Sequence, residues 1–114
     1  MMSLSSGKLA TVIIRARKYE AGIPGSGKAR ELRGLIAAMN DDEKAELTAV
    51  MWIGRDTFEP EEFDEAVSMA RTEATVPTED YLLDNPVLAD HLEEGANALG
   101  IDLESAEDEI FPHV

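Results

Sequence analysis

The chain has 114 residues, no cysteine and a formal net charge of −14 at pH 7. This length fits one domain, and the absence of cysteine excludes a disulfide framework and thiolate chemistry. No stretch reaches the roughly 18 apolar residues of a membrane span, and no basic region precedes an apolar run as in a signal peptide. We therefore expect a soluble, cytoplasmic protein that does not bind a membrane.

Charge is spread unevenly along the chain. Residues 1–58 carry nine Lys/Arg and seven Asp/Glu, a balance of +2, whereas residues 59–114 carry only Arg71 against seventeen acidic side chains, a balance of −16. The acidic half should repel nucleic-acid phosphates and anionic membranes. One interpretation is that this charge keeps the protein soluble and that the basic first helices lie near the acidic later ones. The alternative is an acidic face that docks on a basic partner surface.

Apolar residues recur at helical spacing from the start of the chain. The first stripe consists of Leu9, Val12, Ile13, Ala16 and Tyr19. It predicts a helix that is capped by Ser5 or Ser6 and ends at Gly22. The run 11–14 also suits a strand, but the basic segment 15–18 continues the helical pattern better.

Two more helices follow a glycine-rich loop at residues 22–27. The second helix has a stripe of Leu32, Leu35, Ile36 and Met39, and the third has Leu47, Val50, Met51 and Trp52. Asn40 and Glu43 have the spacing of a capping box at the start of the third helix. Gly54 is expected to end that helix with a positive φ.

The acidic half predicts three further helical segments. Pro60 suits the first position of a fourth helix, and Thr78 suits the cap of a short one. The apolar positions of the three segments are Phe63, Ala66, Val67 and Ala70, then Tyr81, Leu82 and Leu83, then Val87, Leu88, His91, Leu92 and Leu99. The last helix starts after Asn85–Pro86.

These segments predict an all-α fold, a compact bundle of about five helices with short loops. We expect residues 1–100 to form a single helical domain. Residues 101–114 form an acidic C-terminal tail, which either frays or carries one helical turn around Ile110 and Phe111.

The segment 22–29 has the spacing of a phosphate-binding loop, with Gly22, Gly27 and Lys28 in the expected places. Ala29 replaces the hydroxyl residue that such a loop uses on magnesium. The loop should also follow a buried strand, but the preceding segment has a helical pattern. We therefore interpret it as a connection between helices and predict no nucleotide or other cofactor.

Two blocks of sequence resemble the signature of a bacterial family of domains of unknown function. They are LTAVMWIGRDTF at residues 47–58 and YLLDNPVLADHLEEG at residues 81–95. The chain has Asp56 where that family usually has glycine, and His91 where tyrosine is common. The resemblance covers roughly residues 30–100. It implies a compact helical domain and carries no established activity.

Six side chains of these blocks are candidates for an interaction surface: Trp52, Arg55, Tyr81, Asp90, His91 and Glu94. Trp and Arg dominate the energetics of protein interfaces. Alternatively, Trp52 belongs to a packed helix end, where Arg55 stacks on the indole or bonds the last helical carbonyls.

His91 and Glu94 share a helix face, but a metal site needs three or four ligands, and His113 lies in the tail. No catalytic set is evident either, so we predict neither catalytic nor metal-binding residues. The chain most resembles a non-enzymatic protein-interaction or regulatory module, with a protein partner or self-association and no nucleic acid bound.

Two alternatives stay open. One is a small-molecule-binding or enzymatic domain whose pocket lies between the Trp52–Arg55 turn and the Tyr81–Asp90 segment. The other is an acidic mimic of nucleic acid that occupies a basic groove of another protein.

Overall fold

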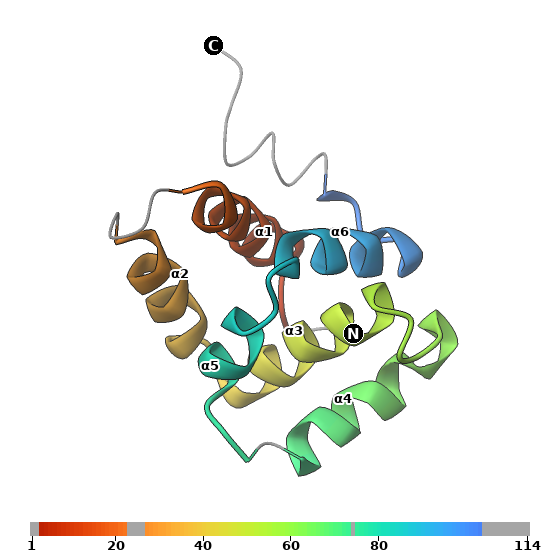
Figure 1. Ribbon diagram of the computed structural model, residues 1–114. Coiled ribbons are helices and arrows are strands. Elements are labelled where there is room, and N and C mark those ends of the chain that lie inside the picture. The colour runs from red at the N-terminus through yellow and green to blue at the C-terminus, as the bar shows by residue number, and fades with distance from the viewer. Residues whose placement is uncertain (1–2, 23–26, 74, 104–114) are drawn as a thin grey trace.

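The computed structural model describes residues 3–22, 27–73 and 75–103. Over these ranges the chain forms six α-helices and one turn of 3₁₀ helix, without a strand (Figure 1). They are α1 (Ser6–Ala21), α2 (Lys28–Ala37), α3 (Asp41–Gly54), η1 (Pro60–Glu62), α4 (Phe63–Thr72), α5 (Thr78–Leu83) and α6 (Leu88–Ala98). The all-α bundle is confirmed, and the short α5 brings the helices in these ranges to six.

Local side-chain caps start α1 and α3 where the sequence predicts. The Ser5 hydroxyl accepts the Lys8 backbone N–H at 3.1 Å. Asn40 Oδ1 accepts the Glu43 N–H at 2.8 Å, and Glu43 Oε1 accepts the Asn40 N–H at 3.1 Å, which completes the capping box. Each cap satisfies backbone donors that have no partner within the helix.

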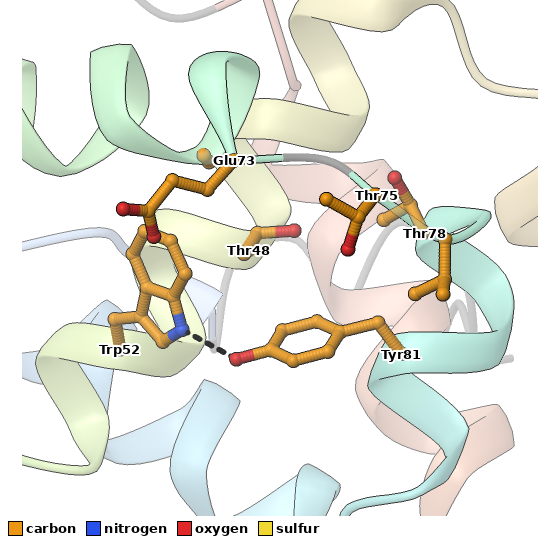
Figure 2. Close-up of a pocket in the computed structure, with 8 residues that line it drawn as sticks. Thr48, Trp52, Glu73, Thr75, Thr78 and Tyr81 are labelled. Atoms are coloured by element: carbon orange, nitrogen blue, oxygen red, sulfur yellow. Dashed lines mark hydrogen bonds between the residues drawn. The ribbon is translucent and has the colours of Figure 1, made fainter.

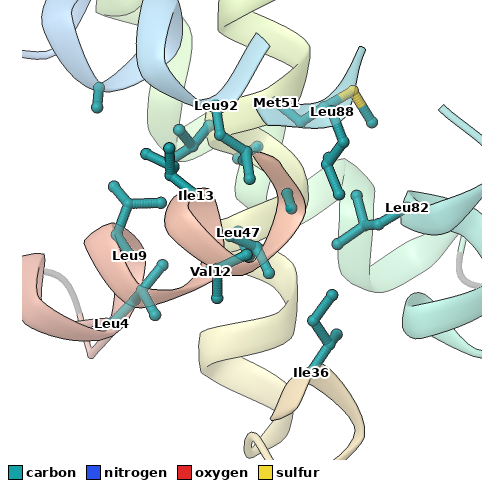
Figure 3. Close-up of a cluster of buried hydrophobic side chains, with 14 of the residues drawn as sticks. Leu4, Leu9, Val12, Ile13, Ile36, Leu47, Met51, Leu82, Leu88 and Leu92 are labelled. Atoms are coloured by element: carbon teal, nitrogen blue, oxygen red, sulfur yellow. The ribbon is translucent and has the colours of Figure 1, made fainter. Parts of the chain in front are cut away.

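Helix α3 is the central element of the fold. All its residues from Ala45 to Gly54 are buried, and α6 and α4 pack against it on different sides (Figure 1). Helix α1 packs on α2 and α6, and α2 packs on α5. The core between α1, α3 and α6 includes Leu9, Val12, Ile13, Leu47, Met51, Leu88 and Leu92 (Figure 3).

Two glycines let the backbones of α3 and α6 touch. A Cβ on Gly54 would lie 1.7 Å from the His91 carbonyl oxygen, and one on Gly95 would lie 2.0 Å from that of Val50. The prediction of a positive φ at Gly54 is wrong, because Gly54 is the last helical residue of α3. The positive φ, 64°, belongs to Asp56 two residues later.

Two buried carboxylates of α3 hold the start of the chain. Glu46, 7% exposed, accepts the backbone N–H groups of Ser3 at 3.0 Å and Leu4 at 2.7 Å. Glu43, 5% exposed, lies 2.5 Å from Lys8 Nζ. The hydrogen bond from Lys8, and then that from its capping partner, lower the pKa of the Glu43 carboxyl, because both favour its charged form.

Ion pairs join the basic half of the chain to the acidic half. Arg17 of α1 pairs with Asp90 of α6 at 3.0 Å and also with Glu93. Arg33 of α2 pairs with Asp80 of α5. The expectation that the basic first helices lie near the acidic later ones is confirmed.

Two predicted helix starts need correction. Pro60 begins the 3₁₀ turn η1, and α4 follows only at Phe63. The N-cap of α5 is Pro77, so Thr78 is the first helical residue and its hydroxyl does not cap the helix.

Beyond α6, Ile101 packs on the core and Leu103 is 8% exposed. The predicted turn at Ile110 and Phe111 lies outside the described residues, as does His113. Within the described part of the chain, no helix is long and apolar enough to cross a membrane.

Candidate functional site

A cavity of about 130 Å³ opens between α3, the end of α4 and the start of α5 (Figure 2). Its walls are mixed in chemistry, with three threonines, two aromatic rings, a carboxylate and two small apolar side chains. They are Thr48, Trp52, Ala70, Glu73, Thr75, Val76, Thr78 and Tyr81. Such a mixture of apolar wall and a few convergent polar groups is typical of binding sites.

The aromatic wall is fixed by contacts from three segments. Trp52 Nε1 donates a hydrogen bond to Tyr81 Oη at 2.9 Å, which joins α3 to α5 (Figure 2). The Trp52 ring also packs against Phe58, with ring centroids 5.7 Å apart. Thr48 and Trp52 are four residues apart on α3, so they lie on the same helix face.

The hydrogen bonds already made leave Thr48 and Glu73 as acceptors in the cavity wall, beside the hydroxyl groups of Thr75, Thr78 and Tyr81. Thr48 Oγ1 donates its only proton to the Lys44 carbonyl at 2.9 Å, so toward the cavity it can only accept. The Tyr81 oxygen accepts from Trp52 and keeps its own proton. Glu73 is exposed and has no ion pair with any residue that the structure describes.

A second cavity of about 380 Å³ adjoins the first and shares Thr48, Ala70 and Thr78 with it. Its other lining residues are Asp41, Lys44, Ala45 and Arg71. Arg71 also pairs with Asp42 at 2.6 Å. The second cavity thus carries two cationic groups and the carboxylate of Asp41, whereas the first carries the carboxylate of Glu73 and no cation.

The candidate residues are divided between this site and the rest of the surface. Trp52 and Tyr81 meet in the cavity wall. Arg55 is exposed, and its Nε donates to Thr57 Oγ1 at 3.1 Å. Stacking on the indole or bonding to the last helical carbonyls were the two contacts suggested for Arg55, whereas the ring contact of Trp52 is with Phe58.

The three candidates on α6 line neither cavity. Asp90 is engaged in the ion pair with α1. His91 Nδ1 lies 2.8 Å from Asn85 Nδ2, and the Asn85 oxygen accepts a backbone N–H. Asn85 therefore donates to His91, which places the imidazole proton on Nε2. Glu94 is exposed.

Sequence reasoning missed Thr48, Glu73, Thr75 and Val76 as site residues. Only Thr48 could have been assigned to the site from the sequence, because it lies one helical turn before Trp52. The other missed residues come from the end of α4 and from the loop that follows it. No periodicity indicates that these segments converge.

Neither of the other motifs forms a site in the described part of the chain. Residues 23–26 of the glycine-rich segment lie outside it, and the element before them is the helix α1, where a phosphate-binding fold has a strand. No group of three or more His, Asp or Glu that could hold a metal ion occurs among residues 3–22, 27–73 and 75–103.

The fold is that of a small all-α domain with a cavity of mixed chemistry beside its central helix. The profile of a family described as a protein of unknown function (DUF3775) matches residues 29–101, and the chain belongs to this family. The match includes both cavities and leaves out α1. Neither the curated proteins nor the solved structures contain a match to the chain.

Proposed function

We propose that this domain is a non-enzymatic interaction module that binds a basic protein partner along α4. The proposal rests on one observation, the uneven neutralisation of the acidic half. Three carboxylates of α5 and α6, Asp80, Asp90 and Glu93, pair with arginines of α1 and α2. Those at the start of α4 do not.

We define the α4 acidic face as five exposed carboxylates of η1 and the first turn of α4. They are Glu59, Glu61, Glu62, Asp64 and Glu65. None of them has an ion pair with the residues that the structure describes. An unbalanced field of this kind attracts basic surfaces and speeds their association.

The position of α4 favours contact with a partner. Helix α4 packs mainly on α3 and on its own η1 turn, and it lies at the edge of the bundle (Figure 1). Met69, on the same helix, is 38% exposed. A partner can therefore approach α4 without displacing another helix.

The test is quantitative affinity capture from a native lysate at moderate salt, with three forms of the tagged protein. The first is the wild type, and the second carries Glu61→Gln and Glu65→Gln on the α4 acidic face. The third carries Asp84→Asn and Glu94→Gln, two exposed carboxylates elsewhere with the same change in charge.

A basic protein that is captured by the wild type and the third form but lost from the second supports the proposal. Its retention should also fall as salt rises, since exposed charges are screened beyond about 8 Å at physiological ionic strength. A protein captured equally by all three forms would place the interaction elsewhere, and capture of no protein would overturn the proposal.

A further inference from the structure

We propose that the cavity between α3, α4 and α5 receives the guanidinium group of an arginine side chain that belongs to a basic segment of the partner. This inference rests on the proposed function and names the chemistry of its central contact. Along α4, the cavity residue Glu73 lies eight positions after Glu65 of the α4 acidic face, about 12 Å at helical rise. One extended segment of a few residues spans that distance.

The polar groups of the cavity match a donor-rich ligand. The Thr48 hydroxyl donates its proton to the Lys44 carbonyl, so its oxygen can only accept a hydrogen bond from a ligand. Glu73 presents an uncompensated carboxylate beside the indole of Trp52 (Figure 2). A guanidinium has five N–H donors and no acceptor, so it can donate to both of these groups.

The remaining walls suit the aliphatic and planar parts of arginine. Trp52 and Tyr81 line the cavity with aromatic surface, and a cation near such a ring gains from its quadrupole. Val76, 52% exposed, and Ala70 offer apolar surface to the methylene stem. The hydrogen bond between Trp52 and Tyr81 holds both rings in place before a ligand arrives.

The two adjoining cavities differ in charge, which determines where a cation binds. Lys44 and Arg71 line the larger cavity together with Asp41, and Arg71 is paired with Asp42, so both signs of charge are present there. The smaller cavity has Glu73 and no cation in its wall. The α4 acidic face extends the attraction beyond the cavity, which favours arginine within a longer basic segment over a small neutral ligand.

Trp52 is the only tryptophan of the chain, so its fluorescence reports directly on the cavity. The probe is a blocked nonapeptide of glycine and serine with one central arginine, titrated into the full chain. The control peptide carries citrulline, which has the same shape without the charge. We expect a saturable change with the arginine peptide, and binding at least about tenfold weaker with citrulline, since charge-assisted hydrogen bonds are lost.

Two variants separate the cavity from the general acidity of α4. Glu73→Gln should weaken binding of the arginine peptide by about tenfold, because one charge-assisted hydrogen bond is lost. Glu65→Gln removes the same charge from the same helix, but about 12 Å away and beyond the Debye length. It should change the affinity by less than about twofold. Both side chains are exposed, so neither variant should impair folding.

Several results would overturn the assignment. They are equal binding of the citrulline peptide, unchanged affinity in Glu73→Gln, or no fluorescence change up to about 10 mM peptide. Equal binding of a lysine peptide would refute a guanidinium site. If Glu73→Gln still captures the partner that Glu61→Gln/Glu65→Gln loses, the cavity proposal fails while the interaction module stands.

Discussion

At the scale of single residues, Trp52 belongs both to the packed core and to the wall of the cavity. The side chain is 8% exposed, its N–H is paired with Tyr81, and its ring packs on Phe58. The exposed edge faces the cavity. Tryptophan is enriched at interfaces where most of its ring is buried and one edge is in contact with water.

We expect Trp52→Ala to lower the free energy of unfolding by about 3–5 kcal/mol, because it leaves a large cavity in the core. Tyr81→Phe should cost only about 1 kcal/mol, since it removes one hydrogen bond and leaves the indole N–H unpaired. Urea denaturation monitored by circular dichroism measures both. A Trp52→Ala variant as stable as the wild type would show that the ring is not part of the packed core.

Asp56 provides a second prediction at this scale. Its φ of 64° lies in the left-handed region, where a side chain is strained and glycine is not. The family pattern that the chain resembles has glycine here. Asp56→Gly should therefore raise the free energy of unfolding by about 0.5–1 kcal/mol. A loss of stability on chemical denaturation would mean that the Asp56 side chain makes a stabilising contact.

At the scale of elements, the crossing of α3 and α6 depends on Gly54 and Gly95. Each glycine faces a carbonyl of the other helix at a distance that no Cβ tolerates. The helices pack this closely because side chains are absent at both positions. Gly34 of α2, by contrast, has open space where a Cβ would be.

Gly95→Ala should destabilise the fold by about 3 kcal/mol or more, because the helices must separate to accommodate the methyl group. Gly34→Ala is the matched control and should stabilise by about 0.5–1 kcal/mol, since alanine is the better helix former. Thermal unfolding of the two variants against the wild type gives the comparison. A neutral Gly95→Ala would contradict the close contact of the two backbones.

The link between α1 and α3 predicts a dependence on pH. The pKa of Glu43 is lowered from its ordinary value of 4.5 by Lys8 and by the capping hydrogen bond. A lowered folded-state pKa contributes stability above the unfolded value, and this contribution is lost as the pH falls through the folded value. Glu43→Gln keeps an acceptor for the cap but removes the charge.

The wild type should therefore be more stable than Glu43→Gln at neutral pH, and the difference should shrink as the pH falls below 4.5. Urea midpoints of both proteins across this range provide the measurement. A difference that stays constant down to about pH 3 would show that the charge of Glu43 does not contribute to stability.

At the scale of the whole molecule, two electrostatic effects on stability compete. The net charge of −14 causes repulsion, and the ion pairs provide attraction. The ion pairs of Arg15, Arg17, Arg33 and Arg71 are all on the surface. Exposed pairs of this kind contribute about 0–1 kcal/mol each. The unpaired carboxylates of the α4 acidic face repel one another and favour expansion.

We expect repulsion to dominate, so raising the salt from about 10 to about 500 mM should stabilise the protein by roughly 1 kcal/mol, or about 4 °C in Tm. Arg17→Gln increases the net negative charge and removes two ion pairs. The Tm of this variant should therefore rise more with added salt than the Tm of the wild type. Differential scanning calorimetry at pH 7 tests both. A Tm that falls with salt would show that the ion pairs outweigh the repulsion.

The sequence by itself determined the helices of this protein, because a helix is specified by residues within four positions of one another. The apolar stripe of α1, the Ser5 cap and the Asn40–Glu43 capping box all act within that range. The charge division left two interpretations open, and the ion pairs of Arg17 and Arg33 bear out the one in which the basic helices lie near the acidic ones.

Only the tertiary structure decided that α3 is central, that Glu43 and Glu46 are buried, and that Gly54 serves a helix crossing. It also created the cavity, since Trp52 and Tyr81 lie 29 positions apart and their hydrogen bond exists only once α5 packs beside α3. Helical periodicity says which face of each helix is apolar, but not which other helix that face meets. That choice depends on the packing of the whole core.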